Sequence, residues 1–126
     1  LAFLRKRSGQ LFSKSRFIAA QFEAYLADGL WLELAKNAND AAQMLGKGVA
    51  KSANARLAFE PEANEVFAIM SGALAQKLQS EGATFYEWPV PKSHMGLLNE
   101  NEKLYRLVAN FGTEKAEVET FLNYLS

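Results

Sequence analysis

Arg106 is the residue whose type and position most clearly suggest a binding role. Alternating apolar and polar residues over 104–111 predict a strand with Arg106 on one of its apolar faces. Arginine is rarely buried without a partner, and its planar guanidinium can hold a carboxylate through two parallel hydrogen bonds. Two alternatives therefore stay open: Arg106 binds a carboxylate ligand, or it pairs with a structural acid, Glu65 or Glu87, on a neighbouring strand.

A second group of candidate binding residues lies near the start of the chain. Lys14 and Arg16, interleaved with serines, could bind a phosphate at the start of a helix. Five cations precede the first acidic residue, Glu23: Arg5, Lys6, Arg7, Lys14 and Arg16. The chain has 14 basic and 14 acidic residues, so this head of +5 is balanced by −5 in the remainder. Such a block either binds nucleic acid, anionic lipid or a phosphate-bearing ligand, or is a solvated helix face.

The remaining titratable groups are expected to be surface residues. His94 is the one histidine and has no nucleophile near it in sequence, so we expect it in a solvated loop. Two acidic pairs are expected to solvate turns without neighbours that perturb their pKa values: Glu60 with Glu62, and Glu100 with Glu102. There is no cysteine and no phosphate-binding or nucleophile-elbow motif. Neither a metal site nor a hydrolase triad is expected.

The hydrophobic pattern predicts an α+β fold: a helical hairpin followed by a small, largely antiparallel sheet covered by helices. Helical spacing predicts one helix over 10–26 and a second from an Asp28 N-cap to 49. Short apolar runs predict strands over 56–59, 65–70, 83–88 and 104–111. Further helices are expected after a Ser71 cap, ending near Gly82, and over 113–125.

Composition is that of an ordinary globular protein, with 49% hydrophobic and 22% charged residues among 126. No apolar run approaches the roughly 20 residues that span a bilayer, and no secretory signal opens the chain. A cytoplasmic protein without a membrane partner is therefore expected. The chain begins at Leu1 with a helix-like segment that lacks a capping residue, so we expect it to be part of something longer.

Several segments resemble bacterial low-specificity threonine aldolases, pyridoxal-phosphate enzymes of the β-eliminating lyase group. The run Arg5-Lys6-Arg7-Ser8-Gly9-Gln10-Leu11-Phe12-Ser13-Lys14-Ser15-Arg16, continuing to Leu26, resembles the segment that follows the cofactor lysine. The resemblance continues in the family's order at 62–67, 82–89 and 105–111, followed by the helix over 113–125. It covers nearly the whole chain.

The resemblance implies the C-terminal part of a fold-type I enzyme that cleaves β-hydroxy-α-amino acids. Threonine or allo-threonine would yield glycine and an aldehyde. Residues 1–51 would be a helical segment that links to or packs on the large domain, and 52–126 the small C-terminal α+β domain. The Schiff-base lysine would lie upstream of Leu1, since no lysine here matches it. This segment would then hold no catalytic residue and be inactive alone.

The resemblance also implies roles for individual residues. Arg106 matches the small-domain arginine that binds the substrate's α-carboxylate. Arg16 matches an arginine near the cofactor phosphate, often contributed across a subunit interface, and Lys14 is a second candidate there. The glycine-rich form of that stretch is replaced here by Gln10-Leu11-Phe12-Ser13-Lys14-Ser15.

Partners follow from the same resemblance and from the apolar N-terminal arm. The expected partners are an amino-acid substrate, pyridoxal 5'-phosphate, the large domain and further copies in a dimer or tetramer. Five apolar side chains exceed what a two-helix hairpin can bury and suggest contact with the large domain or another subunit: Phe3, Phe12, Phe17, Ile18 and Phe22.

Two other functions are compatible with the sequence. Another fold-type I reaction, β-elimination or transamination, would use the same carboxylate-binding arginine. A free-standing anion- or nucleic-acid-binding module would use the basic head, and its affinity would fall steeply with salt. Phe12 and Phe17 fit helix packing better than base stacking, which favours the enzyme and leaves nucleic acid unexpected as a partner.

Overall fold

The structure, a computed structural model, describes residues 1–94 and 96–126. It divides into two compact units, Leu1–Glu33 and Leu34–Ser126. Within the described residues, no helix combines the length and apolar character needed to cross a lipid bilayer. The expected division into domains at residue 51, and the hairpin packing of the first two long helices, stay predictions.

The first unit consists of helices without a buried residue of their own. Helix α1 (Ala2–Arg7) and helix α2 (Ser15–Leu26) bury no side chain, and the 3-10 turn Ala27–Gly29 leads into α3 (Leu30–Val49). Asp28 has a φ of 51°, in the left-handed region, so it forms the turn and the expectation that it caps α3 was wrong.

The second unit is built on a four-stranded antiparallel sheet, as expected. Its strands are β1 (Ala55–Leu57), β2 (Glu65–Ser71), β3 (Tyr86–Glu87) and β4 (Glu102–Val108). Their order across the sheet is β1-β2-β4-β3, and every neighbouring pair is antiparallel. The two long strands, β2 and β4, are therefore the inner ones.

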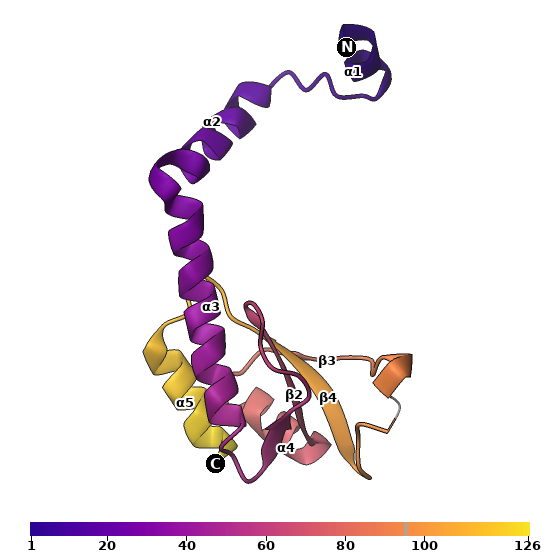
Figure 1. Ribbon diagram of the computed structural model, residues 1–126, viewed down its shortest axis with the longest axis vertical. Helices are drawn as coiled ribbons and strands as arrows, with labels where there is room; N and C mark the ends of the chain where they lie inside the picture. The colour runs from indigo at the N-terminus through magenta and orange to yellow at the C-terminus, as the bar shows by residue number, and fades with distance from the viewer. Residues whose placement is uncertain (95) are drawn as a thin grey trace. The chain divides into compact units, whose positions relative to one another are not determined.

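Helices cover one face of this sheet. Alternate residues of β2 and β4 join a core with α3, α4 (Gly72–Ser80) and α5 (Lys115–Leu125), all labelled in Figure 1. Its best buried members include Val49, Val66, Met70, Leu78 and Leu125. Because successive strand residues point to opposite faces, the other face carries the remaining β2 and β4 side chains.

The strands differ in their bounds from the expectation. The strand expected over 56–59 is Ala55–Leu57, and β2 extends one residue further than expected, to Ser71. Within the strand expected over 83–88, residues 86 and 87 form β3, because residues 83–85 are used to turn the chain back after α4. There the Ala83 N–H donates to the Leu78 carbonyl, and Gln79 Nε2 donates to the Phe85 carbonyl. The last strand begins at Glu102 and ends at Val108, ahead of a turn over 110–113.

The start of α4 is held by the cap that the sequence predicts. Ser71 Oγ accepts a hydrogen bond of 3.2 Å from the Leu74 N–H. We expect Ser71→Ala to lower the free energy of unfolding by about 0.5–2 kcal/mol, because the N–H loses its acceptor. Urea titration would measure this. In Ser80→Ala, at the exposed end of the same helix, the loss should stay below about 0.5 kcal/mol, and equal losses would contradict the capping role.

Candidate carboxylate-binding site

Arg106 lies in the middle of β4, on the sheet face opposite the helices. It stands directly across from Phe67 of β2 and Tyr86 of β3. The next residue along, Leu107, points into the helical core, which fixes the direction of Arg106 by the alternation of the strand. The expected placement of Arg106 is thereby confirmed.

Trp88 and Glu65 contact the Arg106 guanidinium. Its Cζ lies 4.1 Å from the centre of the Trp88 ring, and its Nη1 lies 3.2 Å from Oε1 of Glu65. The Arg106 side chain keeps 31% of its surface exposed. Of the two structural acids considered, Glu65 is thus the ion-pair partner, and Glu87 instead pairs with Lys103 at 2.6 Å and raises the pKa of that lysine. Because Arg106 stays accessible, the ion pair does not exclude a carboxylate ligand.

The segment between β3 and β4 returns over this same sheet face. Trp88, just after β3, meets Phe67 edge to face with ring centres 6.2 Å apart. Beneath the segment, Ile69 of β2 and Leu104 of β4 are almost fully buried, although they point away from the helices. The sheet is therefore covered by helices on one face and by the segment between β3 and β4 on the other. This segment leaves Arg106 partly exposed.

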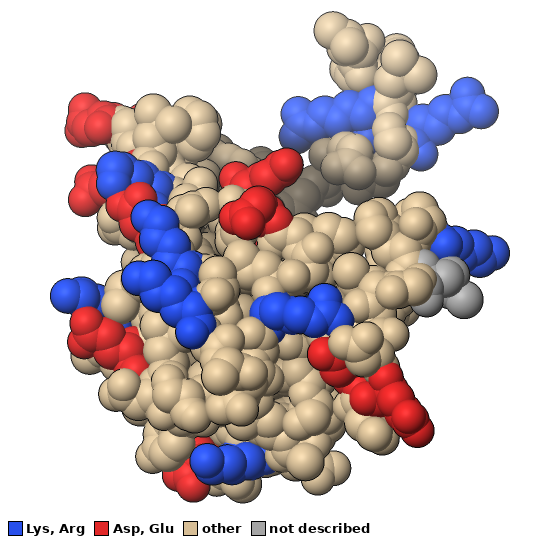
Figure 2. All heavy atoms as spheres, turned by 60° about the horizontal axis from the view of Figure 1, so that its bottom comes forward, with Lys and Arg blue, Asp and Glu red and all other residues tan. Residues whose placement is uncertain are grey.

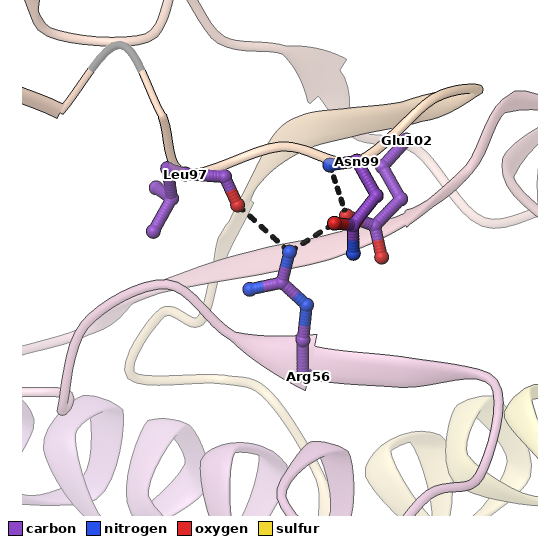
Figure 3. A network of polar contacts seen from close by, with 4 residues as sticks. All are labelled: Arg56, Leu97, Asn99 and Glu102. Carbon is purple, nitrogen blue, oxygen red and sulfur yellow. Dashed lines mark hydrogen bonds and ion pairs between the residues drawn. The ribbon is translucent and has the colours of Figure 1, made fainter.

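Arg56 of β1 anchors the far end of the returning segment (Figure 3). Its Nη2 donates to the Leu97 carbonyl at 2.8 Å and to Glu102 Oε2 at 2.6 Å. The Asn99 N–H donates to the same carboxylate oxygen at 2.8 Å. The hydrogen bonds from Arg56 and Asn99 lower the pKa of Glu102 below its usual range. The expectation that Glu102 is an unperturbed turn residue was wrong, because folding brings the Arg56 side chain of β1 to the Glu102 carboxylate at the start of β4.

This network predicts how stability depends on pH. The folded-state pKa of Glu102 is lowered, so its contribution is present above the unfolded-state pKa of about 4.3 and is lost as pH falls through the folded value. We expect Glu102→Gln to have a lower free energy of unfolding than wild type at pH 7. This difference between variant and wild type should become smaller toward pH 3. Urea midpoints at the two pH values would measure it. The control is Glu100→Gln, an equal charge change in the turn before β4, whose free energy of unfolding at pH 7 should stay close to that of wild type.

His94 is exposed, as expected, in the short 3-10 turn Lys92–His94. Its ring packs edge to face on Phe59 at 5.2 Å, and Ser93 Oγ lies 2.9 Å from its Nδ1. Phe59 in turn meets Phe67 at 5.9 Å. Aromatic rings thus run in contact from His94 to Trp88 along the outer sheet face.

Lys14 and Arg16 lie in the first unit, at the start of α2. Both are exposed, and Lys14 occupies the N-cap position without a side-chain hydrogen bond to the helix. A helix start without a side-chain cap, flanked by two cations, has the donor chemistry that a phosphate group requires. Lys14 and Arg16 are two residues apart in the first unit, whereas Arg106 belongs to the second unit.

The surfaces of the two units differ in character. On the face shown in Figure 2, basic and acidic side chains are interspersed. Several pairs in the second unit form ion pairs, including Lys36 with Asp40 and Lys115 with Glu119. The first unit instead exposes large apolar side chains: Phe3, Leu4, Leu11, Phe12, Phe17, Ile18, Phe22, Tyr25 and Leu26. The expectation that this arm is richer in apolar residues than it can bury by itself is confirmed.

Trp88 is the site residue that the sequence reasoning missed. The alternation of a strand over 83–88 could have indicated it, because positions 86 and 88 lie on the same strand face and Tyr86 pairs with Arg106. Arg56 and Glu102 were also missed as a pair, since 46 residues separate them and no local pattern joins them.

The chain is similar to known threonine aldolases in sequence and in fold. No family model matches the chain. It is 43% identical over 81 residues to a low specificity L-threonine aldolase of Pseudomonas sp. (strain NCIMB 10558), covering 64% of this chain and 23% of that protein. Identity to the low specificity L-threonine aldolase of Pseudomonas aeruginosa is 41%, with the same coverage. The chain thus spans about a quarter of the length of these relatives.

The fold comparison agrees with the sequence. The solved structure of Leishmania major threonine aldolase matches with a TM-score of 0.70 and 26% identity, covering 83% of this chain and 28% of that one. The α+β arrangement of antiparallel sheet and helices is thus shared with that enzyme. Over 64% of its length this chain is thus similar in sequence to a segment of two low specificity L-threonine aldolases, and over 83% it is similar in fold to a segment of the Leishmania major threonine aldolase.

Proposed function

We propose that this chain is the C-terminal part of a pyridoxal-phosphate-dependent lyase that cleaves threonine-like β-hydroxy-α-amino acids to glycine and an aldehyde. The observation that carries the proposal is Arg106, a partly exposed guanidinium stacked on Trp88 in a chain homologous to threonine aldolases. A planar guanidinium with accessible edges suits the α-carboxylate that every such substrate carries. Arg106 would bind and orient the amino acid.

Lys14 and Arg16 are proposed to hold the cofactor's phosphate. Their charges and the start of α2 supply donors for an anion, which fits the group chemically. When bound, pyridoxal phosphate supplies the electron sink for the charge released as the Cα–Cβ bond breaks. The lysine that carries the cofactor is proposed to lie outside this chain, which would make the chain inactive alone.

The exposed apolar arm supports a further part of the proposal. Burial of these side chains against the large domain or a second subunit would remove a large apolar surface from water. A cytoplasmic homo-oligomer, a dimer or tetramer, is accordingly proposed. A stable monomer of this chain in solution, with this surface exposed, would count against burial of these side chains in such a contact.

The test uses the intact gene product purified with pyridoxal phosphate. Cofactor absorbance and aldehyde release from threonine and allo-threonine are the expected results. Absence of both would overturn the proposal.

Elimination or transamination of other amino acids is the second candidate, because Arg106 would bind their carboxylate equally well. A substrate panel on the same protein separates the reactions. Cofactor binding with keto-acid release, and no aldehyde, would favour this alternative.

A further inference from the structure

The Arg106 guanidinium meets two partners that differ in kind. Its Cζ lies over the Trp88 ring, 4.1 Å from the ring centre, a spacing short enough for stacking of the planar guanidinium on the ring. Glu65 approaches its rim, with Oε1 3.2 Å from Nη1. Stacking on an aromatic face leaves the N–H groups at the rim pointing into the plane of the guanidinium, where a carboxylate binds. The two contacts therefore affect an incoming carboxylate differently.

Trp88 is itself held in place by the sheet. Its backbone N–H donates to the Leu104 carbonyl at 2.8 Å, which continues the β3–β4 pairing by one residue. Its ring meets Phe67 edge to face, and Phe67 stands directly across from Arg106. Trp88 thus forms a fixed platform beneath a long side chain that would otherwise adopt many rotamers.

Glu65 holds Arg106 only weakly. Its contact of 3.2 Å is longer than the about 2.7–2.9 Å of charge-assisted hydrogen bonds, and its side chain is 40% exposed. Exposed ion pairs of this kind contribute little. The Arg56–Glu102 pair on the same face is shorter, at 2.6 Å, and is supported by the Asn99 N–H. An external carboxylate that accepts two parallel hydrogen bonds would bind Arg106 better than Glu65 does.

We propose that Glu65 is a displaceable counter-ion and Trp88 a positioning residue, which together keep Arg106 ready for an incoming carboxylate. Glu65 forms an ion pair with the guanidinium in the absence of ligand, and the ligand's carboxylate replaces it when it binds. Trp88 stays and fixes the plane in which the ligand binds. The proposal rests on the proposed function in one respect: it takes the substrate's carboxylate as the ligand of Arg106.

The first experiment measures carboxylate binding without turnover. The ¹⁵N-labelled chain is titrated with sodium acetate against sodium chloride at matched ionic strength, following the Arg106 Nε–Hε resonance, which Arg106→Lys assigns by its loss. Glu65→Gln is expected to bind acetate about two- to fivefold more tightly than wild type, because the competing charge is gone. Glu87→Gln is the matched control: it makes the same charge change on the opposite sheet face, and its affinity should equal that of wild type.

The second experiment tests the positioning role. Trp88→Leu is expected to weaken acetate binding about two- to fivefold, and Trp88→Phe, which keeps an aromatic face, should recover part of the loss. Backbone amide spectra establish that the variants are folded. If Trp88→Leu is unfolded, Trp88→Phe alone tests the positioning role. Its affinity for acetate is expected to be lower than that of wild type by up to about twofold.

Three results would overturn the proposal. They are no acetate response at Arg106 in wild type, an affinity in Glu65→Gln equal to or below that of wild type, and unchanged affinity in both Trp88 variants. Failure of the proposed aldolase function is distinguishable from these. In that case acetate would bind with the expected variant effects while the intact gene product released no aldehyde.

Discussion

Replacing Arg106 by alanine in the intact gene product is expected to raise KM for threonine by about 10- to 100-fold. Loss of hydrogen bonds to a charged group costs about 1.5–3 kcal/mol, and every 1.4 kcal/mol is about tenfold in affinity. The exposure of Arg106 argues for this range rather than for the larger losses of fully buried pairs. Steady-state kinetics of aldehyde release would measure it.

The matched control for that variant is Lys103→Ala. Lys103 lies on the same strand but on the opposite sheet face, where it pairs with Glu87. Its removal deletes one positive charge near the site without touching the guanidinium, so KM should stay within about twofold of wild type. An unchanged KM in Arg106→Ala would assign Arg106 to structure, through its ion pair with Glu65.

The second large effect is expected at Ile69. Ile69→Ala should lower the free energy of unfolding by about 2–5 kcal/mol, because the side chain is fully buried and its truncation leaves a cavity. Denaturant titration would measure the loss. Val108→Ala removes an apolar side chain from the same sheet face, but Val108 is 53% exposed, so its loss should stay below about 0.5 kcal/mol. Similar losses in both variants would contradict a buried layer beneath the returning segment.

The sequence predicted those elements whose signals are local. The apolar run of β2, the Ser71 cap and the helix predicted over 113–125 depend on residues within a few positions of each other, and the structure contains all three. At α5, the side chains of Glu114 and Glu117 form a reciprocal capping box with the backbone. Element type and order could therefore be derived before any tertiary contact was known.

Features that depend on distant partners could not be derived in this way. The Phe85 carbonyl is taken by Gln79, which shortens the expected strand over 83–88, and nothing in the strand's own residues indicates this. Arg106 was placed on the correct face by alternation, yet its choice of Glu65 over Glu87 follows from the β2–β4 register. The position of Arg106 could thus be predicted from the sequence. The residues that contact it could be identified only from the folded structure.

The order β1-β2-β4-β3 puts the sheet's shortest strands at its two edges. β1 has three residues and β3 has two, so few N–H and C=O groups are left along either border to template another strand. Cross-β growth needs a long, flat border of such groups, which this sheet does not offer. The second unit is therefore protected against amyloid-like stacking by strand length alone.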